Sequence, residues 1–135
     1  MQTQSFACIG DPCVSDDIRK LQEDIHIVVS TPGRVCDMIL RRALRVDLIG
    51  IVVLDDADEM LSRGLKDQIY EVFKSAPQRV QVCLFSQTVP VEAHSIMSDF
   101  MREPVRIFKG RDEFVSIIDV REIAPLCHWH SVAIV

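Results

Sequence analysis

Three apolar runs, each ended by a short polar string, constrain the fold of this chain more than any other feature. The runs are Ile25–Val29, Ile49–Leu54 and Val80–Phe85, and the strings are Thr31-Pro32-Gly33-Arg34, Asp55-Asp56-Ala57-Asp58 and Ser86-Gln87-Thr88. Runs of this length, rich in β-branched residues, are typical of strands buried inside a sheet. Because ligands of open α/β sheets bind beyond the carboxyl ends of the strands, the three strings are candidate site residues.

Stretches in which apolar residues recur at helical spacing alternate with these runs. Helices are predicted over residues 16–22, 32–42, 66–74 and 90–100, and further strands over 105–108 and 114–120. Strands that alternate with helices of this length predict an α/β fold, with a parallel sheet flanked by helices. The nearly continuous run Ile25–Val29 predicts a strand covered on both faces. The last stretch, Leu126–Val135, has no readable period.

Composition narrows the setting in which the chain is expected to act. Its 135 residues suit one domain, and a net charge of −5 gives no electrostatic reason to expect nucleic-acid binding, although Arg41, Arg42 and Arg45 cluster. The five cysteines form no Cys-x-x-Cys pair, which suits reduced thiols in the cytosol or nucleus. No signal-peptide layout and no apolar run near the length of a membrane span occur, so no membrane contact is expected.

The aspartates after the second run suit metal and water chemistry. Asp55 is placed to hold Mg²⁺ through its water shell, because this ion takes one or two carboxylates and keeps several waters. A second carboxylate, that of Asp56, can orient and deprotonate an attacking water. The alternative is a solvated turn in which Asp58 caps the next helix.

The other two strings also have a functional and a structural interpretation. Thr31, Gly33 and Arg34 can present backbone N–H groups and a guanidinium to a phosphate, or can form an ordinary Pro-Gly turn. Ser86 and Thr88 can hydrogen-bond the Asp58 region from the neighbouring strand end, or can simply cap a helix.

The histidines carry weaker signals. The string Cys127-His128-Trp129-His130 suggests a metal, but it lacks the distant partner pair that such sites need, and an unstructured tail is the alternative. His26 lies in an apolar strand and is expected to be a packed or edge residue.

Taken together and in order, the strings resemble the DEAD-box RNA helicases, and among these the helicases of translation initiation. The supporting stretches are residues 7–10, 30–38, 53–70, 86–88 and 100–107. Such helicases have two RecA-like domains that close around ATP and RNA. The resemblance implies that residues 1–113 are the C-terminal half of the first of these domains, without its phosphate-loop strand, and that residues 114–135 are a divergent tail.

The resemblance also implies roles for individual residues. Asp55, Asp56 and Asp58 are implied as catalytic, with Asp55 near Mg²⁺; Ser86 and Thr88 as coupling hydrolysis to unwinding; Gly10, Thr31, Gly33 and Arg34 as contacting RNA. Three positions depart from the family. Asp56 stands for the catalytic glutamate, Gln87 for a small alanine that packs tightly, and Asp11 for a glycine. Gln87 is therefore expected to need new space and hydrogen-bond partners.

The implied activity is RNA-dependent ATP hydrolysis and RNA unwinding, with ATP, Mg²⁺, RNA and a scaffold protein of translation initiation as cofactors and partners. No Gly-x-x-x-x-Gly-Lys-Ser/Thr loop occurs, so the chain alone is expected to be inactive. The alternatives are a non-catalytic binding module or decoy, and a degenerate copy without function. Loss of the internal phosphate-loop strand is expected to leave an apolar strand as an edge, through which chains would self-associate.

Overall fold

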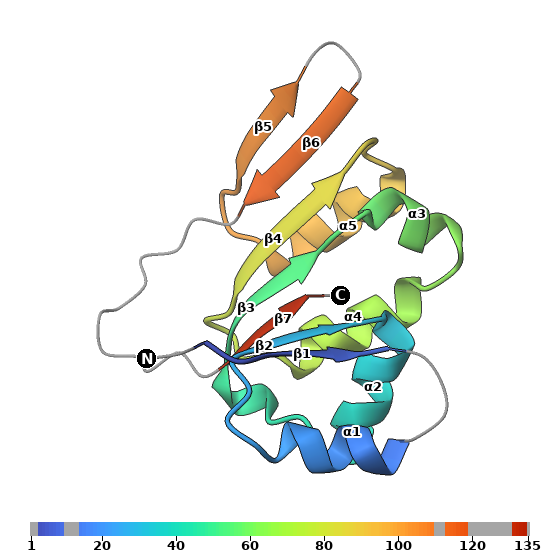
Figure 1. Ribbon diagram of the computed structural model, residues 1–135. Helices are drawn as coiled ribbons and strands as arrows, with labels where there is room; N and C mark the ends of the chain where they lie inside the picture. Colours follow the sequence, from blue (N-terminus) through green and yellow to red (C-terminus); the bar gives the residue numbers. More distant parts are fainter. Residues whose placement is uncertain (1–2, 10–13, 110–112, 119–130, 135) are drawn as a thin grey trace.

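The computed structural model describes residues 3–9, 14–109, 113–118 and 131–134, and a seven-stranded sheet runs through them (Figure 1). The strands are β1 (Ser5–Cys8), β2 (Ile27–Ser30), β3 (Ile49–Leu54), β4 (Gln81–Ser86), β5 (Val105–Lys109), β6 (Glu113–Ile118) and β7 (Ser131–Ile134). The helices are α1 (Val14–Leu21), α2 (Pro32–Leu40), the 3₁₀ turn η1 (Val46–Leu48), α3 (Ala57–Ser62), α4 (Lys66–Ser75) and α5 (Val91–Phe100). The order across the sheet is β1-β2-β7-β3-β4-β6-β5.

The predicted α/β class and its three central strands are confirmed. Strand β3 has the predicted bounds, and β2 and β4 are each displaced by a residue or two toward the polar string that ends them. Helix α4 buries Ile69, Val72 and Phe73 against the sheet, as their spacing predicts. Helix α3 is an addition, because its six residues are too few for an apolar period to be read.

The far side of the sheet is antiparallel. Strand β6 pairs antiparallel with β4 on one side and with β5 on the other, whereas β1, β2, β7, β3 and β4 run parallel. The predicted strands over 105–108 and 114–120 are therefore present as a hairpin, which extends the parallel sheet beyond β4 (Figure 1).

Strand β7 corrects two expectations. It comes from the stretch without a readable period, and it lies between β2 and β3, paired with both. The expected apolar edge is consequently wrong for the described sheet, since its edges are β1 and β5 and the strands β2, β3 and β4 are paired on both sides. Successive residues of a central strand bond alternately to one neighbouring strand and to the other, so even a strand of four residues is joined to both β2 and β3.

The helices leave one face of the central strands open. In Figure 1, α4 and α5 lie behind the sheet, and none of the described helices crosses the face turned to the viewer. Along β3 and β4 burial alternates, with Val52, Leu54, Val82 and Leu84 in the core and the residues between them only half-buried. The prediction that both faces of β2 are covered is wrong, because Val29 is 38% exposed.

Two further features of the described residues bear on the sequence predictions. None of the helices that they form is both long and apolar enough to span a membrane. Cys8, Cys36 and Cys83 form no disulfide with one another, whereas the string Cys127–His130 lies outside the described residues.

Candidate functional site

The junction between β3 and α3 presents two carboxylates at the carboxyl edge of the sheet. Asp55 follows the buried Leu54, and its Oδ1 accepts a hydrogen bond of 3.1 Å from the Asp56 N–H. Asp56 adopts the left-handed conformation (φ 50°, ψ 46°), which aspartate tolerates better than most residues, and it precedes α3. This sharp turn leaves both side chains exposed while Ala57 enters the core.

Asp58 joins the ends of β3 and β4. Its Oδ2 accepts hydrogen bonds from the Thr88 backbone N–H at 2.9 Å and from the Thr88 hydroxyl at 2.8 Å. Its own backbone N–H donates to Ser86 Oγ at 3.0 Å. The predicted contact between the hydroxyl string and the Asp58 region is thus confirmed, and it arises because β3 and β4 are adjacent parallel strands.

These contacts also fix the charge of Asp58. Burial by itself favours the neutral acid, but the hydrogen bonds from Thr88 and its neighbours outweigh it and hold the pKa of Asp58 below its ordinary value. The carboxylate is therefore ionised at neutral pH. The alternative of Asp58 as the helix cap does not hold, because Asp56 occupies the cap position and Asp58 lies in the first turn of α3.

A pocket of about 400 Å³ opens beside this contact. It is lined by Asp56, Asp58, Glu59, Ser62, Gln87 and Thr88. Three of the six residues are acidic and none is basic; Arg63, which pairs with Glu59, is not part of the lining. The pocket is therefore electronegative and suits a cation better than a phosphate group.

The remaining lining residues were partly missed by the sequence reasoning. Gln87 was expected to disturb packing, but it is exposed at the pocket, so its amide costs little to accommodate. Glu59 and Ser62 cannot be identified as pocket residues from the sequence unless α3 is recognised as a helix. On a helix they share one face with Asp58, which brings them to the same pocket.

Only part of an Mg²⁺ and ATP site is present among the described residues. Asp55 supplies one exposed carboxylate of the kind that Mg²⁺ takes, with water or phosphate as the other ligands. The described residues include no group of three His, Cys, Asp or Glu placed to hold a metal. They fit one ligand of the ion, but the acidic pocket does not fit a triphosphate.

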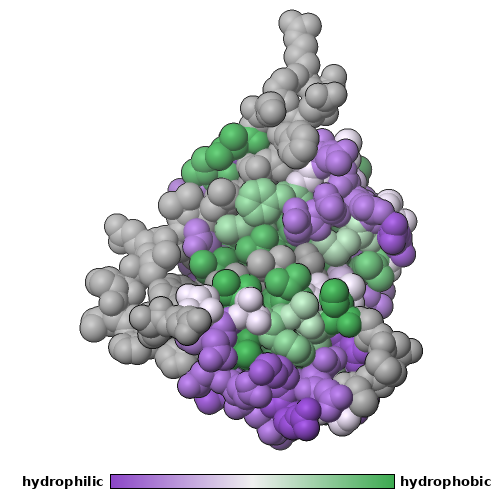
Figure 2. Space-filling view, in the orientation of Figure 1, coloured by the Kyte–Doolittle hydropathy of each residue, from purple (hydrophilic) through white to green (hydrophobic). Residues whose placement is uncertain are grey.

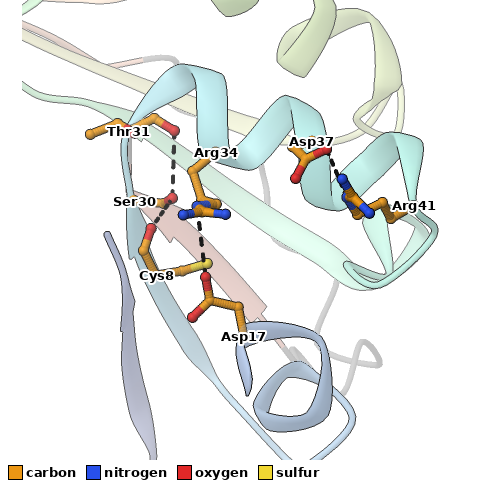
Figure 3. Close-up of polar contacts among 7 residues, drawn as sticks. All are labelled: Cys8, Asp17, Ser30, Thr31, Arg34, Asp37 and Arg41. Carbon is orange, nitrogen blue, oxygen red and sulfur yellow. Dashed lines mark hydrogen bonds and ion pairs between the residues drawn. The ribbon is translucent and has the colours of Figure 1, made fainter. Parts of the chain in front are cut away.

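The predicted RNA-contacting string lies at the start of α2 (Figure 3). Thr31 and Gly33 are exposed, and the Thr31 side chain makes no capping hydrogen bond. The Arg34 side chain is only 14% exposed, and its Nε lies 3.7 Å from Oδ2 of Asp17 on α1. Arg34 therefore faces an internal carboxylate, while Gly10 lies outside the described residues.

Beneath Arg34, the ends of β1 and β2 are joined by a buried hydrogen bond. Ser30 Oγ donates to the Cys8 carbonyl oxygen at 2.5 Å. Burial, together with the neighbouring Asp17, raises the pKa of the Cys8 thiol to about 11, so this thiol is neutral and unreactive at physiological pH. Cys8 therefore has a structural role rather than a reactive one.

Comparison with known proteins places this arrangement in a family. The profile described as DEAD/DEAH box helicase matches residues 2–96, which is more than half of the chain. The chain belongs to the DEAD/DEAH box helicase family. The match includes all three strings.

The relatives of this DEAD-box chain are initiation factors. It is 54% identical over 110 residues to eukaryotic initiation factor 4A-III homolog B of Oryza sativa, covering 82% of this chain and 27% of the relative. It is 59% identical over 106 residues to eukaryotic initiation factor 4A of Caenorhabditis elegans, covering 78% and 26%. A solved DEAD box protein from Methanococcus jannaschii matches with a TM-score of 0.72 at 28% identity, over 76% of this chain and 28% of that one. The chain spans about a quarter of the length of these relatives.

Proposed function

We propose that this chain is the part of a DEAD-box helicase that carries the coupling contact, and that it does not hydrolyse ATP by itself. The observation that carries the proposal is the combination of a formed Asp58–Thr88 contact with an acidic pocket beside it. The contact supports a coupling role for Ser86 and Thr88. The pocket lining argues against a bound triphosphate, because phosphate groups would approach ionised Asp58 and exposed Asp56 with no cation in the lining.

The chemistry that remains is insufficient for turnover. Asp55 would hold Mg²⁺ through water, and Asp56 would act as base with a side chain one methylene shorter than glutamate. A misplacement on the order of 1 Å costs about 10²-fold in rate. The missing phosphate loop costs more, since neither carboxylate provides a donor to the phosphates.

RNA contact, if retained, falls to the start of α2. Thr31 and Gly33 are exposed there and would donate to the RNA backbone, with Gly10 beside them in the family pattern. Arg34 is proposed to position α2 through Asp17 rather than to meet the phosphate directly. The net charge of −5 opposes tight binding, so RNA affinity is proposed to be low.

A second candidate is a non-catalytic binding module or decoy. Helices α4 and α5 pack against each other although the sequence has no phosphate loop, with Phe100 of α5 stacked on Phe73 of α4 at 5.0 Å. A partner of the intact factor, such as a scaffold protein of translation initiation in the cytoplasm or nucleus, would find this surface preserved. Residues 1–113 are proposed as the domain portion and 114–135 as the divergent tail; a degenerate copy without function is the third alternative.

The experiment that tests the first proposal measures phosphate release by the full chain, with and without RNA, in the presence of ATP and Mg²⁺. Asp55→Asn is the control for the metal carboxylate, and Gln87→Ala restores the small family residue at the pocket. All three proteins are expected to release phosphate at the rate of a denatured sample. RNA-stimulated release that Asp55→Asn abolishes would show that the chain is a competent enzyme and would reject the proposal.

A pull-down with the initiation scaffold separates the second candidate from the third. Equal capture of the wild-type chain and of Asp55→Asn, with no effect of ATP, supports a module that uses its packed surface. No capture of either protein, at concentrations at which an intact factor binds, leaves the degenerate copy as the interpretation.

A further inference from the structure

Strand β7 fills a slot between two strands that are consecutive in the chain. Its register pairs Val132 with Ile27 of β2 on one side and with Ile51 of β3 on the other. Without β7, β2 and β3 would each present a row of unpaired backbone groups, separated by about 10 Å, which is two strand spacings. The slot is therefore built to accept one extended, parallel segment.

The hold of β7 on this slot is short. It has three register pairs with β2 and four with β3, and the ladder to β3 is irregular between Ile49 and Ile51. The pairing of β5 with β6 has five pairs by comparison. Because β7 pairs only with β2 and β3, its departure would break these pairs and none of those between β3 and β4, which carry the functional site.

The segment that connects β6 to β7 is longer than the distance it has to span. β6 ends at Ile118, opposite Cys83 near the start of β4, and β7 begins at Ser131, opposite Ile49 at the start of β3. Cys83 and Ile134 are both register partners of Val53, so Ile118 lies level with the end of β7, and Ser131 is roughly 17 Å away across three strand spacings and three residues along the strand. The twelve residues between them can span up to about 40 Å when extended. By length alone, β7 can therefore reach its own slot or that of an adjacent chain.

The surface beside the slot favours a second copy as the partner. The open face of the sheet carries half-buried Ile51, Val53, Cys83 and Phe85 next to exposed Val29. Figure 2 shows apolar side chains gathered over the middle of this face. A second chain brought there by strand exchange would cover this surface, whereas a short unrelated peptide in the slot would not.

We propose that the slot between β2 and β3 accepts β7 of a second copy, so that two chains form a strand-exchanged dimer. Each chain gives one β7 and receives one, so every backbone pair of the single chain is kept and apolar surface is covered in addition. This proposal concerns assembly and is independent of the proposed function.

Disulfide trapping in the full-length chain tests the exchange. Ile51 and Val132 are register partners, so Ile51→Cys in one chain and Val132→Cys in another bring the two introduced thiols together only when β7 crosses between chains. On its other side Ile51 pairs with Gln81 of β4, so no native cysteine lies opposite it. Mixed in equal parts and oxidised, these variants are expected to give a disulfide-linked product of about twice 15.3 kDa, in an amount that rises with concentration.

The matched control keeps Ile51→Cys and moves the second thiol from Val132 to Ile134, which is the register partner of Val53. A mixture of Ile51→Cys with Ile134→Cys is expected to give at least about five-fold less product, because the two positions are out of register. Each single variant, oxidised alone, measures the background from the five native cysteines.

The double variant with both thiols in one chain completes the design. A product only at 15.3 kDa at every concentration, with no mixed product above background, shows that β7 stays in its own slot and overturns the proposal. The absence of any disulfide between the two introduced thiols, in either format, also overturns it. Where circular dichroism shows that a variant does not fold like the wild type, light scattering of the unmodified chain is used instead. A molecular mass that stays at that of one chain as the concentration rises then overturns the proposal.

Discussion

The contact between Asp58 and Thr88 allows a prediction whose size follows from its geometry. Thr88→Val removes one hydroxyl and keeps the shape of the side chain, so the 2.8 Å hydrogen bond to Asp58 Oδ2 is lost while the backbone bond at 2.9 Å stays. A hydrogen bond to a charged group contributes about 1.5–3 kcal/mol in general. Thr88 is exposed, so we expect the lower end, with the free energy of unfolding reduced by about 1–1.5 kcal/mol.

Asp58→Ala should cost more, because it removes the acceptor of both Thr88 bonds and of the 3.1 Å bond from the Glu59 N–H. We expect a loss of about 2–3 kcal/mol. Once Asp58 is replaced by alanine, removing the Thr88 hydroxyl breaks no further hydrogen bond and should cost nothing more. The coupling energy of the two substitutions should therefore equal the cost of Thr88→Val, about 1–1.5 kcal/mol.

The assay is urea unfolding followed by far-ultraviolet circular dichroism, at neutral pH, for the wild type, both single variants and the double variant. Thr31→Val is the matched control, since Thr31 is also an exposed threonine after a strand but makes no side-chain capping bond. It should change stability by less than about 0.5 kcal/mol. A coupling energy below about 0.3 kcal/mol would refute the reasoning, because independent sites add to within that margin.

Three further predictions concern the titration of Asp58, the Cys8 thiol and the Phe100 ring. The hydrogen bonds that lower the pKa of Asp58 make a stabilising contribution that is present above about pH 4 and is lost as the pH falls through the folded-state pKa. The free energy of unfolding of Asp58→Asn should therefore depend less on pH in this acid range than that of the wild type. The pKa of the Cys8 thiol is raised from 9.0 to about 11, so this thiol should react with iodoacetamide at least about 100-fold more slowly in the native than in the unfolded chain, as measured by mass spectrometry. Asp17→Asn should speed the reaction of the native chain. Phe100→Ala should lower the free energy of unfolding by about 2–3 kcal/mol and Phe100→Leu by less, because the ring stacks on Phe73 and meets the edge of Tyr70.

What the sequence predicted well is what is decided locally. The bounds of β3 follow from an apolar run that ends at a charge, and the burial of Ile69 in α4 follows from helical spacing. The contact of Asp58 with Thr88 also follows, because the carboxyl ends of neighbouring parallel strands meet at one edge of the sheet. Each of these depends on one or two short stretches.

What the sequence did not predict depends on pairing over long separations or on the balance of nearby charges. The position of β7 between β2 and β3 has no periodic signature, because four residues in a central slot show no alternation to read. The pairing of Arg34 with Asp17 was not predicted, because the two residues lie on different helices and nothing in their spacing indicates that they meet. The left-handed conformation of Asp56, which precedes α3, was likewise not predicted.

The contact between Asp58 and Thr88 and the binding of a nucleotide have different structural requirements. The first needs only β3, β4 and the start of α3, and these are fixed by four register pairs and the buried side chains of Leu54, Ala57 and Leu84. The second needs donors directed at phosphates, and those belong to a loop that the sequence lacks. Since the core that positions Asp58 does not depend on the loop, the contact persists where catalysis is not expected. A preserved motif geometry is therefore evidence for the fold and the family, and only the presence of a phosphate cradle would make it evidence for turnover.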